Sequence, residues 1–275
     1  MEKEQAIPAA SRAGSRAPSS TALGQPRRRQ RNLPESAALI AVLVALVVFF
    51  SFTSEFFFNY DNLINIMQNV AVIGIIAVPA TVLIVAGQVD LSVGSAAGFI
   101  GMVMAVAATP MDANTSPFGL GLSVGGALVV ALLAAVLIGV INGFFVTAVG
   151  LNSIITTLGT LAIWRGLTKV LGDGQTIRID GFGTLGISRP VFNIPLPVIL
   201  FAIVIAVCSL MLKYTVYGRS MYAIGANLEA ARLSGIRVNR LIFAGFMLNA
   251  GMVALAGLIR LSQLGGCVGE CWSGL

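Results

Sequence analysis

A succession of long apolar stretches, almost free of charged residues, constrains this chain more than any other feature of its sequence. The 275 residues are 57% hydrophobic and only 10% charged, whereas soluble domains carry about 25% charged residues. A run of about 20 apolar residues can cross a bilayer core of roughly 30 Å as a helix. The sequence therefore predicts an all-α fold, a polytopic integral membrane helix bundle.

The apolar stretches predict about 7 membrane spans, within a range of 6 to 9. The fourth stretch is long for one crossing, so it is predicted to tilt or to break near 139–143. Small residues are frequent in these stretches, which predicts a close approach between helix backbones. The stretches lie at 37–52, 70–86, 91–108, 120–149, 154–170, 195–212 and 241–259.

Basic residues gather in two segments that flank apolar stretches. Of the 17 Lys and Arg residues, 7 lie within the first 31 positions and 5 lie within 213–240. Positive charge is retained on the cytoplasmic side of membranes, so both segments and the N-terminus are predicted to be cytoplasmic. This placement accounts for the net charge of +6 without a nucleic-acid partner.

These patterns predict three parts of the chain. Residues 1–34 have no apolar periodicity and are predicted to form a disordered basic cytoplasmic tail. Residues 35–260 are predicted to form the transmembrane domain, with a cytoplasmic segment at 213–240. Residues 261–275 form an atypical, Gly-rich tail.

The residue types needed for catalysis or metal binding are scarce. The chain has no histidine and 3 cysteines, so neither a zinc site nor a histidine-based membrane enzyme is expected. A disulfide between Cys267 and Cys271 stays open. The GxxxxGK[ST] pattern of a P-loop is missing from the sequence. We therefore predict no catalytic residues, no metal ligands and no cofactor.

Asp90 lies between two apolar stretches, where an ionisable group needs a partner, water or a helix N-terminus. The favoured interpretation is that Asp90 caps a helix starting at Leu91, and a direct role in transport is the alternative. Other polar residues at membrane depth are candidates for a substrate path together with Asp90, although packing is the favoured role of each. These candidates are Gln68, Asn142, Asn152, Thr156 and Thr157.

The segment 217–240 carries the most informative pattern. Asn227 can cap a short helix over 228–234, and Gly235 can end it. Glu229 and Arg232 are predicted to point away from an apolar side. Such a helix suits either docking into a groove of another protein or lying on anionic lipid, and the residues alone leave both open. The predicted apolar side consists of Ala230, Ala231, Leu233 and Ile236.

Four motifs together resemble the ribose-type permeases of bacterial ABC importers. The resemblance extends from about 59 to 257, and its most specific part is the long match at 218–236. The motifs are GxxDLSVGS at 87–95, ING at 141–143, TLGT at 157–160 followed by Arg165-Gly166, and GRxxYAIGxNxEAARLSGI at 218–236.

The resemblance implies a permease of the bacterial inner membrane that imports a ribose-type monosaccharide. It implies four partners: a cytoplasmic ABC ATPase, a periplasmic sugar-binding protein, a second permease copy or paralogue, and the lipid bilayer. In that family the segment corresponding to 218–236 is the coupling helix, which fits a cleft on the ATPase. A coupling role is therefore expected for Gly225, Asn227, Glu229, Ala230, Ala231, Arg232 and Gly235.

Three alternatives stay open. An ion-driven secondary transporter usually carries ionisable residues within the membrane, and apart from Asp90 the spans here are almost free of charge. A permease for branched-chain amino acids has a similar overall design. After Arg260 the sequence departs from the family pattern. The third alternative is therefore a truncated, non-transporting product of such a permease gene, and a natural short form also stays open.

Overall fold

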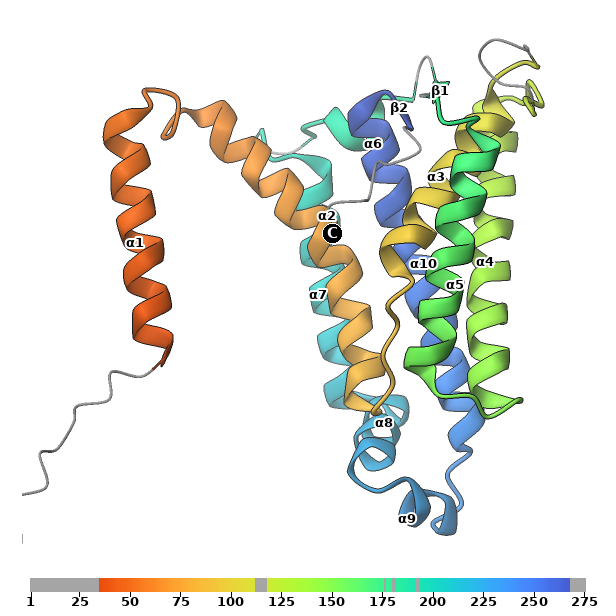
Figure 1. Ribbon diagram of the computed structural model, residues 1–275. Helices are drawn as coiled ribbons and strands as arrows, with labels where there is room; N and C mark the ends of the chain where they lie inside the picture. The colour runs from red at the N-terminus through yellow and green to blue at the C-terminus, as the bar shows by residue number, and fades with distance from the viewer. Residues whose placement is uncertain (1–34, 112–117, 176, 180–181, 191–192, 268–275) are drawn as a thin grey trace, which may run out of the picture. The chain divides into compact units, whose positions relative to one another are not determined.

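A computed structural model describes residues 35–111, 118–175, 177–179, 182–190 and 193–267, and confirms the predicted all-α membrane class (Figure 1). The chain divides into two compact units, and each is described by itself. The first ends at Ser54 and contains α1 (Glu35–Thr53). The second begins at Glu55 and contains the remaining described elements.

Seven apolar helices in the described part of the chain correspond one to one to the predicted stretches. Two of them, α1 and α3 (Val93–Ala108), have shorter apolar parts. Five are long and apolar enough to cross a membrane by length and composition. These five are α2 (Tyr60–Val85), α4 (Val124–Thr147), α5 (Ser153–Leu171), α7 (Leu196–Tyr214) and α10 (Val238–Leu264).

Short elements connect these helices at the two ends of the second unit. At one end, α6 (Thr184–Ile187) lies near the antiparallel pair of β1 (Ile177–Arg178) and β2 (Gly266–Cys267) (Figure 1). At the opposite end lie α8 (Val216–Ala226) and α9 (Leu228–Leu233). Cys267 is therefore part of a strand, whereas Cys271 lies outside the described residues.

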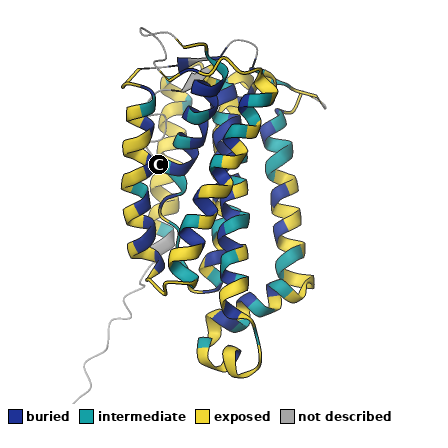
Figure 2. Ribbon diagram, turned by 90° about the vertical axis from the view of Figure 1, so that its right-hand side faces the viewer, coloured by how far each residue is buried: buried dark blue, intermediate teal, exposed yellow. Residues whose placement is uncertain are grey.

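The helix α10 is the central element of the second unit. Of its apolar window, 61% of the residues are buried, against 17–39% for the other four long spans. The helices α2, α4, α5 and α7 carry both buried and exposed residues, as the burial colours of Figure 2 show, and many of their exposed residues are large and apolar. In a membrane, these exposed apolar faces are available to lipid tails. The central place of α10 matters because it carries a polar residue of the candidate site.

The predicted break in the fourth span near 139–143 is wrong, since α4 is one continuous helix. Its glycines instead bring α4 close to α10. A Cβ on Gly139 would lie 2.9 Å from the Cβ of Ala250, and one on Gly143 would lie 2.7 Å from Cδ2 of Phe243. The helix stays unbroken because backbone groups at this depth need their intrahelical hydrogen bonds.

Two predicted boundaries also change. The helix α2 begins at Tyr60 rather than at 70, because the polar first turns are helical although their hydropathy is low. The helix α10 runs from Val238 to Leu264, so it is longer at both ends than the predicted stretch 241–259.

Replacing Gly139 by Leu is expected to destabilise the protein, because the new side chain would overlap Ala250 and Met247 of α10. Overpacking of this kind costs about 1–3 kcal/mol. The matched control is Gly125→Leu in the first turn of α4, where a Cβ would meet no described atom within 4 Å. Thermal unfolding in detergent should give a lower midpoint for Gly139→Leu alone. Equal midpoints for the two variants would contradict this packing.

Candidate functional site

The chain leaves its helical path between α2 and α3. The helix α2 ends at Val85, and Gly87 follows the C-cap residue Ala86 with a φ of +75°. The N–H of Gly87 donates to the carbonyl oxygen of Ile84 at 2.9 Å. The N–H of Gln88 donates to the carbonyl oxygen of Leu83 at 3.0 Å. These two hydrogen bonds are the pair found in the Schellman motif, a glycine C-cap. Residues 88–92 are then non-helical and run alongside α5 toward α3 (Figure 1).

Two hydroxyl groups at the start of α5 satisfy the backbone of this segment. The N–H of Val89 donates to Oγ of Ser153 at 3.2 Å, and the N–H of Leu91 donates to Oγ1 of Thr157 at 3.1 Å. Non-helical backbone is tolerated at membrane depth only where protein or a water-filled cavity surrounds it. Ser153 and Thr157 therefore take the place of helical hydrogen bonds for residues 88–92.

Asp90 is the centre of a polar network that joins this segment to α4 and α10. Its Oδ1 accepts hydrogen bonds from the backbone N–H and the hydroxyl of Ser92, at 2.9 and 2.6 Å. Its Oδ2 accepts from Nδ2 of Asn249 on α10 at 2.9 Å. Nδ2 of Asn142 on α4 donates to the hydroxyl of Ser92 at 2.9 Å. Asp90 is half-buried, whereas Ser92, Asn142 and Asn249 are fully buried.

The prediction that Asp90 caps a helix starting at Leu91 is wrong. The helix α3 starts at Val93, and the residue in the N-cap position is Ser92, whose side chain makes no capping bond. The N–H groups of Val89 and Leu91 donate to Ser153 and Thr157 rather than within a helix, and both residues are non-helical. The Asp90 carboxylate is thereby free to connect α10 to the segment.

The structure brings three of the six predicted path residues together: Asp90, Asn142 and Thr157. The other three lie in different settings. Gln68 donates to the carbonyl oxygen of Gly186 on α6 at 3.4 Å, and exposed Asn152 caps α5 by accepting from the N–H of Ile154 at 2.9 Å. Thr156 is buried, and its hydroxyl has no hydrogen-bond partner among the described residues.

Sequence analysis missed Ser92, Ser153 and Asn249. Asn249 carried a usable signal, because it is a lone amide within the apolar stretch 241–259, and a polar group there requires a partner. Ser92 lies inside the GxxDLSVGS motif. Ser153 carried no signal of its own, since a serine at the start of a helix is a common capping residue.

Some polar atoms around the network are buried without partners in the described structure. They are Oδ1 of Asn142, Oδ1 of Asn249 and the hydroxyl of Thr156. Such atoms are uncommon in proteins and indicate water or an alternative arrangement. No group of three or more His, Cys, Asp and Glu within the described ranges could hold a metal ion. The carboxylate of Asp90 and the amide and hydroxyl groups around it provide hydrogen-bond donors and acceptors.

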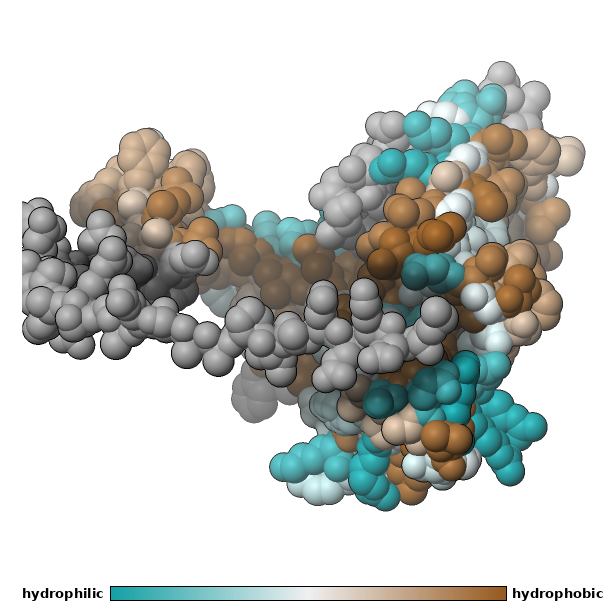
Figure 3. Space-filling model, turned by 60° about the horizontal axis from the view of Figure 1, so that its bottom comes forward, coloured by the Kyte–Doolittle hydropathy of each residue, from teal (hydrophilic) through white to brown (hydrophobic). Residues whose placement is uncertain are grey.

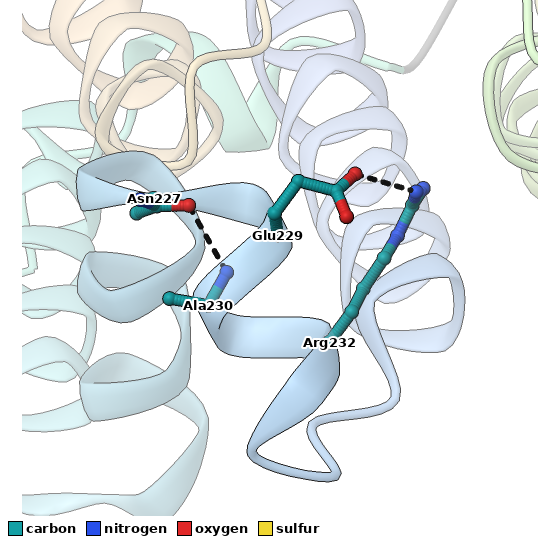
Figure 4. Close-up of polar contacts among 4 residues, drawn as sticks. All are labelled: Asn227, Glu229, Ala230 and Arg232. Carbon is teal, nitrogen blue, oxygen red and sulfur yellow. Dashed lines mark hydrogen bonds and ion pairs between the residues drawn. The ribbon is translucent and has the colours of Figure 1, made fainter.

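A second candidate element lies at the end of the unit that carries α8 and α9. The Asn227 side chain accepts a hydrogen bond from the N–H of Ala230 at 3.0 Å (Figure 4), which confirms the predicted cap of α9. Gly235 follows the helix with a φ of +79°, which confirms the predicted glycine end. Glu229 and Arg232 point toward one another, with 3.4 Å between Oε1 and Nη1, and both are exposed.

The predicted apolar side of this helix divides into an inner and an outer part. Ala231 is buried and Ile236 packs against the neighbouring core, whereas Ala230 is exposed and Leu233 is 89% exposed. The physical reason is helical geometry, since positions 231 and 233 are separated by roughly 200° around the axis. Figure 3 shows small hydrophobic areas among hydrophilic residues at this end of the molecule.

Comparisons with known proteins agree with this architecture. Residues 62–268 match the family described as branched-chain amino acid transport system / permease component. The chain is 35% identical over 240 residues to the ribose import permease protein of Haemophilus influenzae, covering 85% of this chain and 71% of that protein. The corresponding Escherichia coli K12 protein is 35% identical over 238 residues, covering 84% and 70%.

A further relative has a different named substrate. The autoinducer 2 import system permease protein of Yersinia enterocolitica is 34% identical over 247 residues, which cover 89% of this chain and 65% of that protein. No solved structure matches the chain.

Replacing Thr157 by Val is expected to loosen residues 87–92, because the N–H of Leu91 would lose its acceptor. An unsatisfied buried donor costs about 1–3 kcal/mol. Hydrogen–deuterium exchange should therefore become faster in this segment. Thr157→Ser keeps the hydroxyl and should restore slow exchange.

The matched control for this experiment is Thr168→Val on the same helix. The Thr168 hydroxyl is buried and donates to the carbonyl oxygen of Trp164 at 2.7 Å, and it accepts no bond from the segment. Exchange at 87–92 should match the wild type in this variant. Equal exchange in Thr157→Val and Thr168→Val would contradict the role of Thr157.

Proposed function

Because this chain belongs to the family of branched-chain amino acid transport system permease components, we propose that it is the permease of an ATP-driven monosaccharide importer. Its substrate would be a ribose-type sugar, moved into the cytoplasm across the bacterial inner membrane. The observation that carries the proposal is the exposed helix α9, whose tip presents Leu233 between charged residues. The polar network around Asp90 supplies the proposed substrate path.

The helix α9 is built to present a surface to another protein. The Asn227 cap and the buried Ala231 hold it firmly. Leu233 projects outward, and Glu229 and Arg232 form a charged rim. An apolar anchor with a polar rim suits a groove on a partner protein. Since the sequence has no P-loop pattern, we propose that this partner is a separate cytoplasmic ABC ATPase.

The polar network favours a hydroxyl-rich substrate over a branched-chain amino acid. Asp90 can accept hydrogen bonds from sugar hydroxyls, and the free amide oxygens of Asn142 and Asn249 can do the same. A branched-chain amino acid would require a group complementary to its carboxylate and a pocket for its apolar side chain. The relatives named for ribose and autoinducer 2 import support this preference.

The remaining partners follow from the same proposal. A periplasmic sugar-binding protein would deliver substrate to the end that carries α6. A second permease copy or a paralogue would complete the path within the lipid bilayer. The N-terminus would be cytoplasmic, on the same side as α8 and α9, in accordance with the positions of the basic residues.

Uptake into proteoliposomes tests this function. The protein would be reconstituted with an ABC ATPase and a sugar-binding protein from the same organism, and labelled D-ribose and L-leucine would be compared. We expect ribose uptake that requires ATP. ATP-dependent uptake of leucine alone would identify an amino-acid importer instead. Uptake driven by an ion gradient without ATP would identify a secondary transporter, and a stable complex without uptake would indicate a non-transporting subunit.

Reversing either charge of α9 is expected to weaken ATPase binding by tenfold or more, because like charges opposed across an interface are costly. The variants are Glu229→Arg and Arg232→Glu, and the measurement is co-purification of the ATPase with the membrane-inserted chain. The double variant Glu229→Arg/Arg232→Glu is the control. It restores the ion pair between positions 229 and 232, but the charge that each position presents to the ATPase is still reversed.

The double variant should stay defective, because an exposed ion pair contributes only about 0.2–1 kcal/mol to stability. Recovery in the double variant would show that the pair matters for α9 itself. Normal co-purification in both single variants would argue for α9 lying on lipid.

A further inference from the structure

The last turn of α8 lies directly against the end of α2, at the point where the chain leaves its helical path. A Cβ on Gly225 would overlap the carbonyl oxygen of Val85 and would lie 3.4 Å from Cα of Ala86. The obstacle is backbone, which cannot rotate away as a flexible side chain can. Only a residue without a side chain allows this approach between α8 and α2.

A single apolar cluster extends this contact from α9 to α2. Its members are tightly buried, and packed interiors of this kind shift as units rather than deform continuously. A displacement of α9 is therefore passed to the end of α2 through α8. The cluster contains Val82, Leu83 and Ala86 of α2, Met221 and Ile224 of α8, Ala231 of α9, and Val238, Ile242 and Phe246 of α10.

The chain beyond this contact is the part of the site that can move most readily. Gly87 adopts a left-handed conformation, and a Cβ there would meet no described atom within 4 Å. Residues 89–91 belong to no helix, and side chains of other helices, such as Ser153 and Asn249, hold them. A shift at Ala86 thus reaches Asp90 within four residues of chain.

We propose that Gly225 is a positioning residue that transmits movement of α8 and α9 to residues 86–92, which makes this segment the moving element of the substrate path. The inference rests on the proposed function, since it assumes that an ATPase moves α9. It adds the route of that movement, which runs through a backbone contact at Gly225 and the hinge at Gly87.

The variant Gly225→Ala tests the route in the full complex with ATPase and binding protein, reconstituted in proteoliposomes. The new Cβ would force α8 away from Val85, and no residue of α9 is replaced. We expect normal ATPase co-purification and ATP hydrolysis, with D-ribose uptake per ATP reduced tenfold or more. The matched control is Gly251→Ala on α10, where a Cβ meets no described atom within 4 Å, and it should transport as the wild type does.

Hydrogen–deuterium exchange provides a second measurement that requires no known substrate. Its first part uses the wild-type complex alone. Exchange at 86–92 should differ several-fold between the nucleotide-free and the ATP-trapped complex, and this difference should disappear in Gly225→Ala. Identical exchange in the two wild-type states would overturn the inference even if Gly225→Ala fails to assemble. So would a normal ratio of uptake to hydrolysis in Gly225→Ala. Failure of the wild-type chain to bind an ATPase would instead overturn the proposed function.

Discussion

A chain that leaves its helical path inside a membrane must find partners for every backbone group that it frees. In residues 88–92, the N–H groups of Val89 and Leu91 find acceptors in side chains at the start of α5, namely Ser153 and Thr157. The N–H groups at the two ends of the segment donate to Leu83 and Asp90. The bonds to Ser153 and Thr157 fix where α3 begins and how closely α5 lies against it. They also determine the position along α10 and α4 at which Asp90 lies. The architecture of the candidate site thus follows from the satisfaction of a few backbone N–H groups.

The position of Asn249 depends in turn on how closely other helices approach α10. A Cβ on Gly257 would lie 2.6 Å from the carbonyl oxygen of Ala97, which places α3 against α10. Gly139 and Gly143 likewise allow α4 to lie against α10. Association in lipid relies on such close contacts, because apolar burial alone provides little driving force there. The glycines therefore hold Asn249 and Asn142 at hydrogen-bond distance from the broken segment.

Local patterns in the sequence predicted much of this structure. They did not predict the contacts between segments that lie far apart in the chain. Apolar stretches located all seven apolar helices, and the positions of Asn227 and Gly235 predicted the beginning and end of α9. The start of α3 was missed because the deciding hydroxyls lie more than 60 residues away. The outward position of Leu233 was missed because composition alone does not give the direction of a side chain on a helix of 6 residues.

The same bonds that stabilise the broken segment also keep the energy of moving it low. If the freed N–H groups find new partners as the segment moves, two neutral hydroxyl bonds, at about 0.5–1.5 kcal/mol each, amount to roughly 1–3 kcal/mol. That value lies in the range of coupling free energies between distant sites, about 1–3 kcal/mol. A continuous helix through 86–92 would instead require several cooperative backbone bonds to break within the membrane, where each freed group is costly. A segment held by side chains can therefore respond to a distant partner, while the glycine-packed helices around it stay in place.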